Sequence, residues 1–304
     1  MKSCRSRFWI LASSSVSRFA VRWARTAAVA AVLVVSARFA AGQAVAPDEA
    51  VSRIGDYVER YYRRAQAIVA EETVSIQPLG RDLGSEGFAR RLTYELRLEW
   101  NPDAGDDEAP AKVTRQLLKV NGRSPGPKQE PECLDPRGVS PEPLAFLLPN
   151  RRHKYIFTAA GPGRVDGRPA IMVDYRSRGA EAPKVEWDKE CASIDLPGRS
   201  RGRVWADPES AEILRLDEQL TGMVDIPVPW KQQRRGAPLY MTIERADMSI
   251  RYHRVAFTDP DETLVLPSAI QTLAIIRNSG VPRVRISQTF ASYRRFVTGS
   301  RIVQ

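Results

Sequence analysis

Residues 202–220 read GRVWADPESAEILRLDEQL, and this stretch sets the pattern for much of the chain. Two runs of strand-forming residues, Arg203–Ala206 and Ile213–Leu220, flank the segment Asp207-Pro208-Glu209-Ser210. Proline presets φ at the second position of a β-turn, and an aspartate side chain before it can accept hydrogen bonds from the backbone that follows. The stretch therefore predicts an antiparallel hairpin.

The clearest two-residue periodicity lies upstream, between residues 88 and 100. Charged residues and a threonine separate the apolar positions, as expected for a strand with one buried and one wet face. The apolar positions are Phe88, Leu92, Tyr94, Leu96, Leu98 and Trp100.

An amphipathic helix is predicted before these strands. Asp48 is a suitable N-cap residue, and apolar residues then recur at spacings of three and four from Val51 to Ile68. The pattern predicts a helix that ends near Glu71. Its apolar stripe needs a partner surface, which the following sheet can supply.

The remainder of the chain predicts further strands separated by turn residues. They are expected at Glu72–Leu79, Lys112–Val120, Lys154–Ala159, Pro169–Arg176, Val185–Ile194, Leu239–Phe257, Thr263–Leu266, Ser268–Arg277 and Arg283–Phe296. The fold class is mainly β (α+β): one large curved antiparallel sheet or half-barrel of about nine to ten strands, with the N-terminal helix packed on it. Two long segments, Asn121–Pro143 and Met223–Pro238, are predicted as loops, and Leu144–Leu148 as a short apolar helix or plug.

The positive charge of the chain is concentrated at its N-terminus. The formal net charge is +10, but residues 1–42 hold seven basic residues and no acidic one. The rest has 39 basic against 36 acidic residues, a net charge of +3. Arginines on the predicted strands alternate with acidic residues, which is typical of a wet sheet face. We therefore expect no nucleic-acid partner.

The N-terminal segment has the organisation of an export signal. A basic region, Met1–Arg25, precedes the apolar run Thr26–Ser36, which is too short to span a bilayer comfortably. Small residues then favour cleavage after Gly42 or Ala44. The alternative is an uncleaved signal anchor. The predicted organisation is a signal peptide, residues 1–42, and a single β-rich domain, residues 43–304, exported to the periplasm or secreted, with no transmembrane segment in the mature chain.

The cysteines are interpreted on the expectation that the protein is exported. Cys4 leaves with the signal peptide, so Cys133 and Cys191 remain in an oxidising compartment. A Cys133–Cys191 disulfide is predicted, and two buried thiols are the alternative. Two isolated cysteines without a nearby histidine pair do not make a zinc site, so no metal and no cofactor are expected.

The predicted hairpin carries a family resemblance. Gly202–Glu209 followed by Ile213–Leu216 resembles the strand, aromatic, Asp-x-x turn, strand pattern of the periplasmic lipoprotein-carrier superfamily, the LolA-like half-barrels with their RseB and LppX branches. Ser210 replaces the usual turn glycine. The segment Gln288–Phe296 is similar to a terminal strand of uncharacterised exported bacterial proteins. The resemblance implies a hydrophobic cavity between sheet and helix, a binding or carrier role, and no catalytic residues.

Catalytic signals are weak in comparison. Gly122-Arg123-Ser124-Pro125-Gly126 matches a nucleophile-elbow pattern, but the elbow needs a helix after the serine and the prolines prevent one. His153 and His253 are the two histidines of the chain and are the candidates for a general base. A hydrolase that uses His153 or His253 is an alternative function.

Large aromatic side chains are the stronger indication of function. The expected function is binding of an apolar or lipid-like ligand, or of an envelope protein partner, between sheet and helix. A structural or regulatory interaction module of the envelope is the alternative. The side chains expected to face inward and line the cavity are Trp100, Trp205, Tyr240, Tyr252 and Phe290.

Overall fold

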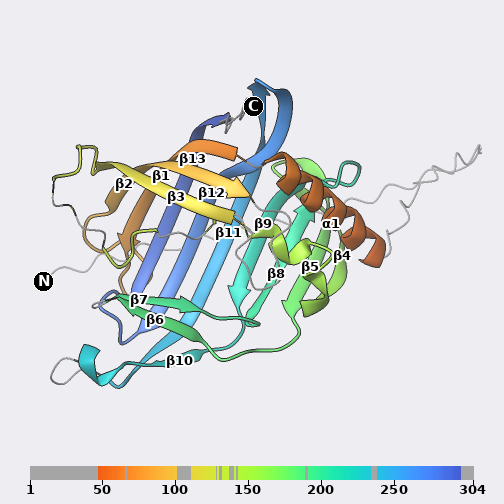
Figure 1. Cartoon of the computed structure of the whole chain (residues 1–304). Coiled ribbons are helices and arrows are strands. Elements are labelled where there is room, and N and C mark those ends of the chain that lie inside the picture. Colours follow the sequence, from red (N-terminus) through yellow and green to blue (C-terminus); the bar gives the residue numbers. More distant parts are fainter. Residues whose placement is uncertain are drawn as a thin grey trace, which may run out of the picture. The chain divides into compact units, whose positions relative to one another are not determined.

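Within the described residues, eleven strands form one antiparallel sheet (Figure 1). Their order is β3-β2-β1-β13-β12-β11-β9-β8-β5-β4, and β10 pairs with the start of β11. The strands are β1 Ala67–Pro78, β2 Arg90–Trp100, β3 Ala111–Val120, β4 Tyr155–Val165, β5 Arg168–Ser177, β8 Ser200–Ala206, β9 Ile213–Leu220, β10 Val224–Pro227, β11 Tyr240–Thr258, β12 Asp261–Arg277 and β13 Arg283–Arg295. Two shorter strands, β6 Lys184–Asp188 and β7 Cys191–Asp195, pair separately.

The structure is a computed structural model, and it describes residues 47–65, 67–100, 111–127, 129, 132–136, 140–141, 143–188, 191–233 and 238–295. The predicted signal peptide, Cys4 and the last residues of the chain lie outside this part. None of the helices within it is long and apolar enough to cross a membrane.

The first and last strands of the described chain are neighbours. β1 pairs with β2 on one side and with β13 on the other, where Glu72 lies opposite Phe290. This pairing brings residues more than 200 positions apart into one ladder. The predicted fold class, a large curved antiparallel sheet with an N-terminal helix, is confirmed, with eleven strands in the main sheet.

Strands β8 and β9 form the antiparallel hairpin that was predicted for residues 202–220. The Asp207 carboxylate accepts hydrogen bonds from the backbone N–H groups of Glu209 and Ser210, both at 3.0 Å. Ala211, one position after the serine, takes the left-handed conformation with φ 60°. Burial opposes ionisation of Asp207, but these bonds and one from Arg168 lower its pKa below the ordinary value.

Helix α1, Pro47–Arg64, covers one face of the sheet. It lies against β4, β5 and the short 3₁₀ helix η1, Leu144–Leu147, which is the predicted apolar plug. Gly55 allows close packing, because a Cβ atom there would lie 2.8 Å from the carbonyl oxygen of Leu147. The helix also contacts the β8–β9 turn, because Arg53 donates hydrogen bonds to the carbonyl oxygens of Pro208 and Glu209.

The helix ends seven residues earlier than its apolar spacing predicted. Arg64 is its last residue, and Ile68 and Ala70 belong to β1, where they are buried between β2 and β13. The β-branched residues that follow the helix form ladder hydrogen bonds on both sides, and this outweighs the helical periodicity.

Three further predictions were wrong in detail. The periodic strand was expected to start at Phe88, but β2 begins at Arg90. Phe88 therefore lies outside the strand and is fully exposed. Residues 185–194 were expected to be one strand but form the hairpin of β6 and β7. Pro267 was expected to separate two strands, yet it lies within β12, opposite Tyr252 at a register shift that accommodates the missing N–H.

The other half of the sheet is covered by the loop that follows β3. Leu134 packs on the buried side chains of β1, β2 and β13, and Asp135 is 5% exposed and pairs with Arg90 at 3.0 Å. The predicted Cys133–Cys191 disulfide is present and joins this loop to the start of β7. The disulfide therefore links the loop-covered half of the sheet to the β6–β7 hairpin.

Candidate functional site

The aromatic residues expected to line a cavity occupy three different environments. Trp100, Tyr252 and Phe290 are 5%, 8% and 6% exposed and belong to the main core, together with the residues of α1. Trp100 stacks on Tyr62 of the helix with ring centroids 4.6 Å apart. These three side chains therefore belong to one buried core, which also contains residues of the helix.

Trp205 and Tyr240 lie elsewhere. Tyr240 is 52% exposed at the start of β11. Trp205 lies on the face of the sheet opposite to α1, whereas an inward orientation was expected, because the inward position on β8 is taken by Val204, which is fully buried in the core. There Trp205 lines an open pocket of about 530 Å³.

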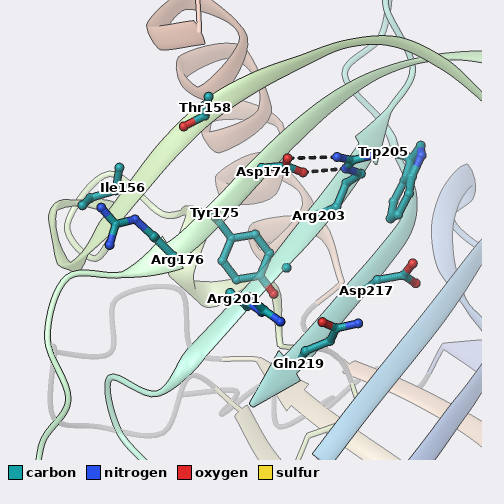
Figure 2. A pocket seen from close by; sticks show the side chains of 11 residues that line it. Ile156, Thr158, Asp174, Tyr175, Arg176, Arg201, Arg203, Trp205, Asp217 and Gln219 are labelled. Atoms are coloured by element: carbon teal, nitrogen blue, oxygen red, sulfur yellow. Dashed lines mark hydrogen bonds and ion pairs between the residues drawn. The ribbon is translucent and has the colours of Figure 1, made fainter. Parts of the chain in front are cut away.

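This pocket lies on the outer face of the wall formed by β4, β5, β8 and β9 (Figure 2). We use "outer face" for the side opposite α1 and "inner face" for the side that α1 covers. Strand alternation separates the two, because successive side chains of a strand point to opposite faces. The lining residues are Ile156, Thr158, Asp174, Tyr175, Arg176, Arg201, Gly202, Arg203, Trp205, Asp217 and Gln219.

The strand register arranges most of these side chains in three rows that cross the wall. The first row consists of Ile156, Arg176, Arg201 and Gln219; the second of Thr158, Asp174, Arg203 and Asp217; the third of Met172, Trp205 and Arg215.

The charged side chains of the second row are all paired, either within the row or with Arg215 of the third row. Arg203 pairs with Asp174 through two hydrogen bonds, Nε to Oδ1 at 2.5 Å and Nη2 to Oδ2 at 2.9 Å (Figure 2). The hydrogen bonds that Arg203 donates to the Asp174 carboxylate raise the pKa of Arg203. Asp217, also in this row, accepts hydrogen bonds from Arg215 at 2.8 Å and from the Ser249 hydroxyl at 2.7 Å. These contacts fix the floor of the pocket.

The third row places an indole among guanidinium groups. The guanidinium carbon of Arg215 lies 4.8 Å from the ring centroid of Trp205, and that of Arg203 lies 5.7 Å away. Both distances are within the range of cation–π attraction. Trp205 also packs against the small buried cluster of Val165, Ala170 and Leu214, at one end of the pocket.

The first row carries unbalanced positive charge. Arg176 and Arg201 are directly opposite each other on neighbouring strands, and both are exposed. Within the part of the chain that the structure describes, neither has an ion pair with an acidic side chain. Like charges in this cross-strand position repel each other. The arrangement is therefore unfavourable for the free protein and suited to an anion placed between the two guanidinium groups.

The inner face behind the first row holds a partly buried carboxyl group. The Tyr175 hydroxyl donates a hydrogen bond to Glu218 at 2.9 Å. Burial raises the pKa of Glu218, although hydrogen bonds from Tyr175 and Ser200 act in the opposite direction. Burial and the charge of Glu218 also raise the pKa of Tyr175. Gly202 makes room for this pair, because a Cβ there would meet the Tyr175 hydroxyl at 2.6 Å.

The histidines and the serine of the elbow-like motif are not brought together by any interaction in the described residues. The ring of His253 lies beside Tyr293, with centroids 6.1 Å apart, and burial lowers its pKa. His153 is exposed in the 3₁₀ helix η2, Arg152–Lys154, and its carbonyl oxygen accepts a hydrogen bond from Arg178. Across the described residues, no group of three His, Cys, Asp or Glu side chains could hold a metal ion.

No family model matches the sequence, and no curated protein matches it either. Comparison with solved structures gives similarities of low identity over most of the chain. A DUF1329 family protein from Desulfovibrio piger is 10% identical with a TM-score of 0.41, covering 83% of this chain and 95% of that one. A putative outer membrane lipoprotein-sorting protein domain from Vibrio parahaemolyticus is 10% identical with a TM-score of 0.34, covering 84% and 95%. A LolA superfamily protein from Nitrosomonas europaea is 8% identical with a TM-score of 0.32, covering 84% and 97%. Identities this low do not indicate what the chain binds.

Proposed function

We propose that this chain is an exported, non-catalytic binding protein that holds an anionic amphiphile on the outer face of the β4–β5–β8–β9 wall. The observation that carries the proposal is the opposed pair Arg176 and Arg201, which has no acidic partner among the described residues. An anionic group between them would convert a repulsive contact into two charge-assisted hydrogen-bonding contacts. Carboxylate, sulfate and phosphate groups all have this chemistry.

The apolar part of the ligand is assigned to the other end of the pocket. Trp205 lies four residues from Arg201 on the same strand, a separation of about 13 Å at the usual rise of a β-strand. Between them, the second row is already paired, so it offers few free charges to the ligand. A molecule with an anionic head at the first row and an apolar body that reaches Trp205 fits this order of side chains.

The inward aromatic residues have a supporting role in this proposal. Trp100, Tyr252 and Phe290 fill the core beneath the sheet and hold the wall in place, whereas Trp205 contacts the ligand. The proposed ligand is still apolar or lipid-like in part, as expected from the sequence, but we assign its binding site to the outer face of the wall.

The test is calorimetric titration with n-decyl phosphate, and with n-decyl maltoside as an uncharged amphiphile. We expect the phosphate to bind and the maltoside to bind much more weakly. The double variant Arg176→Ser/Arg201→Ser should lose about a hundredfold in affinity for the phosphate, because two charge-assisted contacts disappear. Trp205→Ala should weaken the binding of the phosphate without changing its salt dependence.

The matched control is Arg81→Ser/Arg91→Ser, which removes the same charge from two exposed positions away from the pocket. It should bind n-decyl phosphate like the wild type. Equal binding of the two amphiphiles, or unchanged affinity in the Arg176/Arg201 variant, contradicts the proposal. Native mass spectrometry of protein purified from its own envelope then identifies the natural ligand, and the absence of any copurifying anionic amphiphile would count against the function.

A further inference from the structure

Exposed apolar side chains gather at one end of the sheet, away from the pocket. Trp230, Leu239 and Tyr240 are 76%, 63% and 52% exposed, and they lie beyond the paired residues Pro227 and Tyr240 or at that pair itself. They flank or belong to β10, the 3₁₀ helix η3 (Trp230–Gln232) and the start of β11, a hairpin at the lower edge of Figure 1. We call these three residues the apolar tip. Among the described residues, the other exposed large apolar side chains are Phe88, which precedes β2, Leu118, on β3, and Met223, at the far end of β10.

The exposure is part of the folded hairpin. Val224 and Ile226 of β10 and Ile243 of β11 are buried beneath it, where the β6–β7 hairpin contributes Val185 and Ile194. The backbone N–H of Val228 donates to the carbonyl oxygen of Leu239 at 2.9 Å. The hairpin therefore has its own buried core, and the exposed side chains of the tip are not part of it.

The chemistry of the tip fits the boundary between lipid headgroups and acyl chains. Tryptophan and tyrosine prefer this depth because each has an apolar ring and a polar atom. The ammonium of Lys231 lies 5.7 Å from the ring centroid of Trp230, which places a cation beside the apolar surface. The sequence from Ile226 to Ile243 contains three basic residues and no acidic one. An electrostatic contribution is therefore expected from anionic lipids.

We propose that the apolar tip docks this protein on a lipid bilayer that contains anionic lipids, with Trp230 and Leu239 inserted at the interface. The wall with its pocket belongs to the same sheet, so docking would hold an amphiphile-binding site near a membrane. The inference stands on the tip alone and does not depend on the proposed ligand.

Vesicle cosedimentation tests the proposal. The protein is purified from the producing cells, its N-terminus is determined by intact mass, and it is mixed with vesicles of phosphatidylcholine with or without phosphatidylglycerol. We expect binding to the anionic vesicles. Trp230→Ser/Leu239→Ser should weaken it at least tenfold, the loss expected when a large apolar side chain no longer leaves water. Phe88→Ser removes a fully exposed aromatic ring elsewhere and should leave binding unchanged.

Two measurements separate insertion from simple adsorption. Lipids brominated in their acyl chains should quench tryptophan emission in the wild type and much less in Trp230→Phe. Lys231→Gln should weaken binding to anionic vesicles alone, whereas Lys119→Gln, at an exposed position on β3, should have no effect. Equal cosedimentation of the wild type and the Trp230/Leu239 variant, or quenching that persists in Trp230→Phe, overturns the proposal.

Discussion

The two faces of the β4–β5–β8–β9 wall differ in what their side chains do. On the inner face, Val173, Val204 and Leu216 are 1%, 0% and 0% exposed and pack beneath α1. On the outer face, the alternate residues of the same strands are mostly charged or polar and line an open pocket together with Trp205. The inner face is a buried apolar core, whereas the outer face leaves charged side chains accessible to a ligand.

Stability and binding therefore depend on different faces of the wall. Close-packed inner residues should respond strongly to any change of volume, because packing cannot relax around them. Exposed outer residues should contribute little to the free energy of unfolding and more to ligand affinity. Gly202 and Glu218 are informative because they lie opposite each other on the inner side of the wall, directly behind the pocket. Arg201 is informative because its charge is unpaired among the described residues.

The largest effect is expected for Gly202→Val. A Cβ atom there would lie 2.1 Å from the carbonyl oxygen of Asp217 and 2.6 Å from the Tyr175 hydroxyl. The contact with backbone cannot be relieved by a rotamer change, so β8 and β9 must separate. We expect the free energy of unfolding to fall by about 3 kcal/mol or more, measured by urea denaturation.

Gly179→Ala is the control for this variant. A Cβ atom at Gly179 has no atom within 4 Å, and its φ lies outside the left-handed range. The change should alter the free energy of unfolding by about 0.5 kcal/mol at most. Similar losses in the two variants would show that Gly202 is not a point of close approach.

A pH-dependent effect is expected at Glu218. Burial raises the pKa of this carboxyl in the folded state, so the folded protein holds the proton more strongly than the unfolded chain. The corresponding stability is fully present below the ordinary pKa of glutamate and is lost as the pH rises through the raised value. Glu218→Gln removes this loss, and the glutamine oxygen can still accept the bond from Tyr175.

The measurement is the free energy of unfolding at several pH values from 4 to 8. The advantage of Glu218→Gln over the wild type should grow with pH and then level off. Glu181→Gln, at an exposed position, is the control and should follow the wild type. An advantage that is constant over the range would contradict a raised pKa at Glu218.

Much of the fold could be predicted from the sequence, because the deciding signals are local. The turn chemistry of Asp207 and Ser210 identified the β8–β9 hairpin, and strict alternation from Leu92 to Trp100 identified β2. Errors arose where tertiary pairing decided the outcome. Ile68 continued a helical spacing but entered a strand with partners on both sides, and Pro267 was accommodated inside β12.

The candidate site was harder to predict because it depends on register between distant segments. Arg176 and Arg201 are separated by the β6–β7 hairpin, and no local pattern shows that they lie opposite each other. In the sequence, the arginines of these strands are indistinguishable from an ordinary wet face. Trp205 was recognised as important, but its direction depended on which face of β8 the helix covers.

The smallest effect is expected for Arg201→Gln, and it has the opposite sign to the others. Removing one of two opposed guanidinium groups relieves cross-strand repulsion, so the free protein should gain a few tenths of a kcal/mol in its free energy of unfolding. The gain should shrink as salt screens the repulsion. Arg176→Gln should give a similar gain, and the double variant should gain little more, because either single change removes the same repulsion. A loss of stability in either single variant would mean that its guanidinium has a stabilising contact, and the anion site would lose its main support. A gain in stability together with weaker binding of n-decyl phosphate would show that the wall retains an unfavourable charge pair for the sake of its ligand.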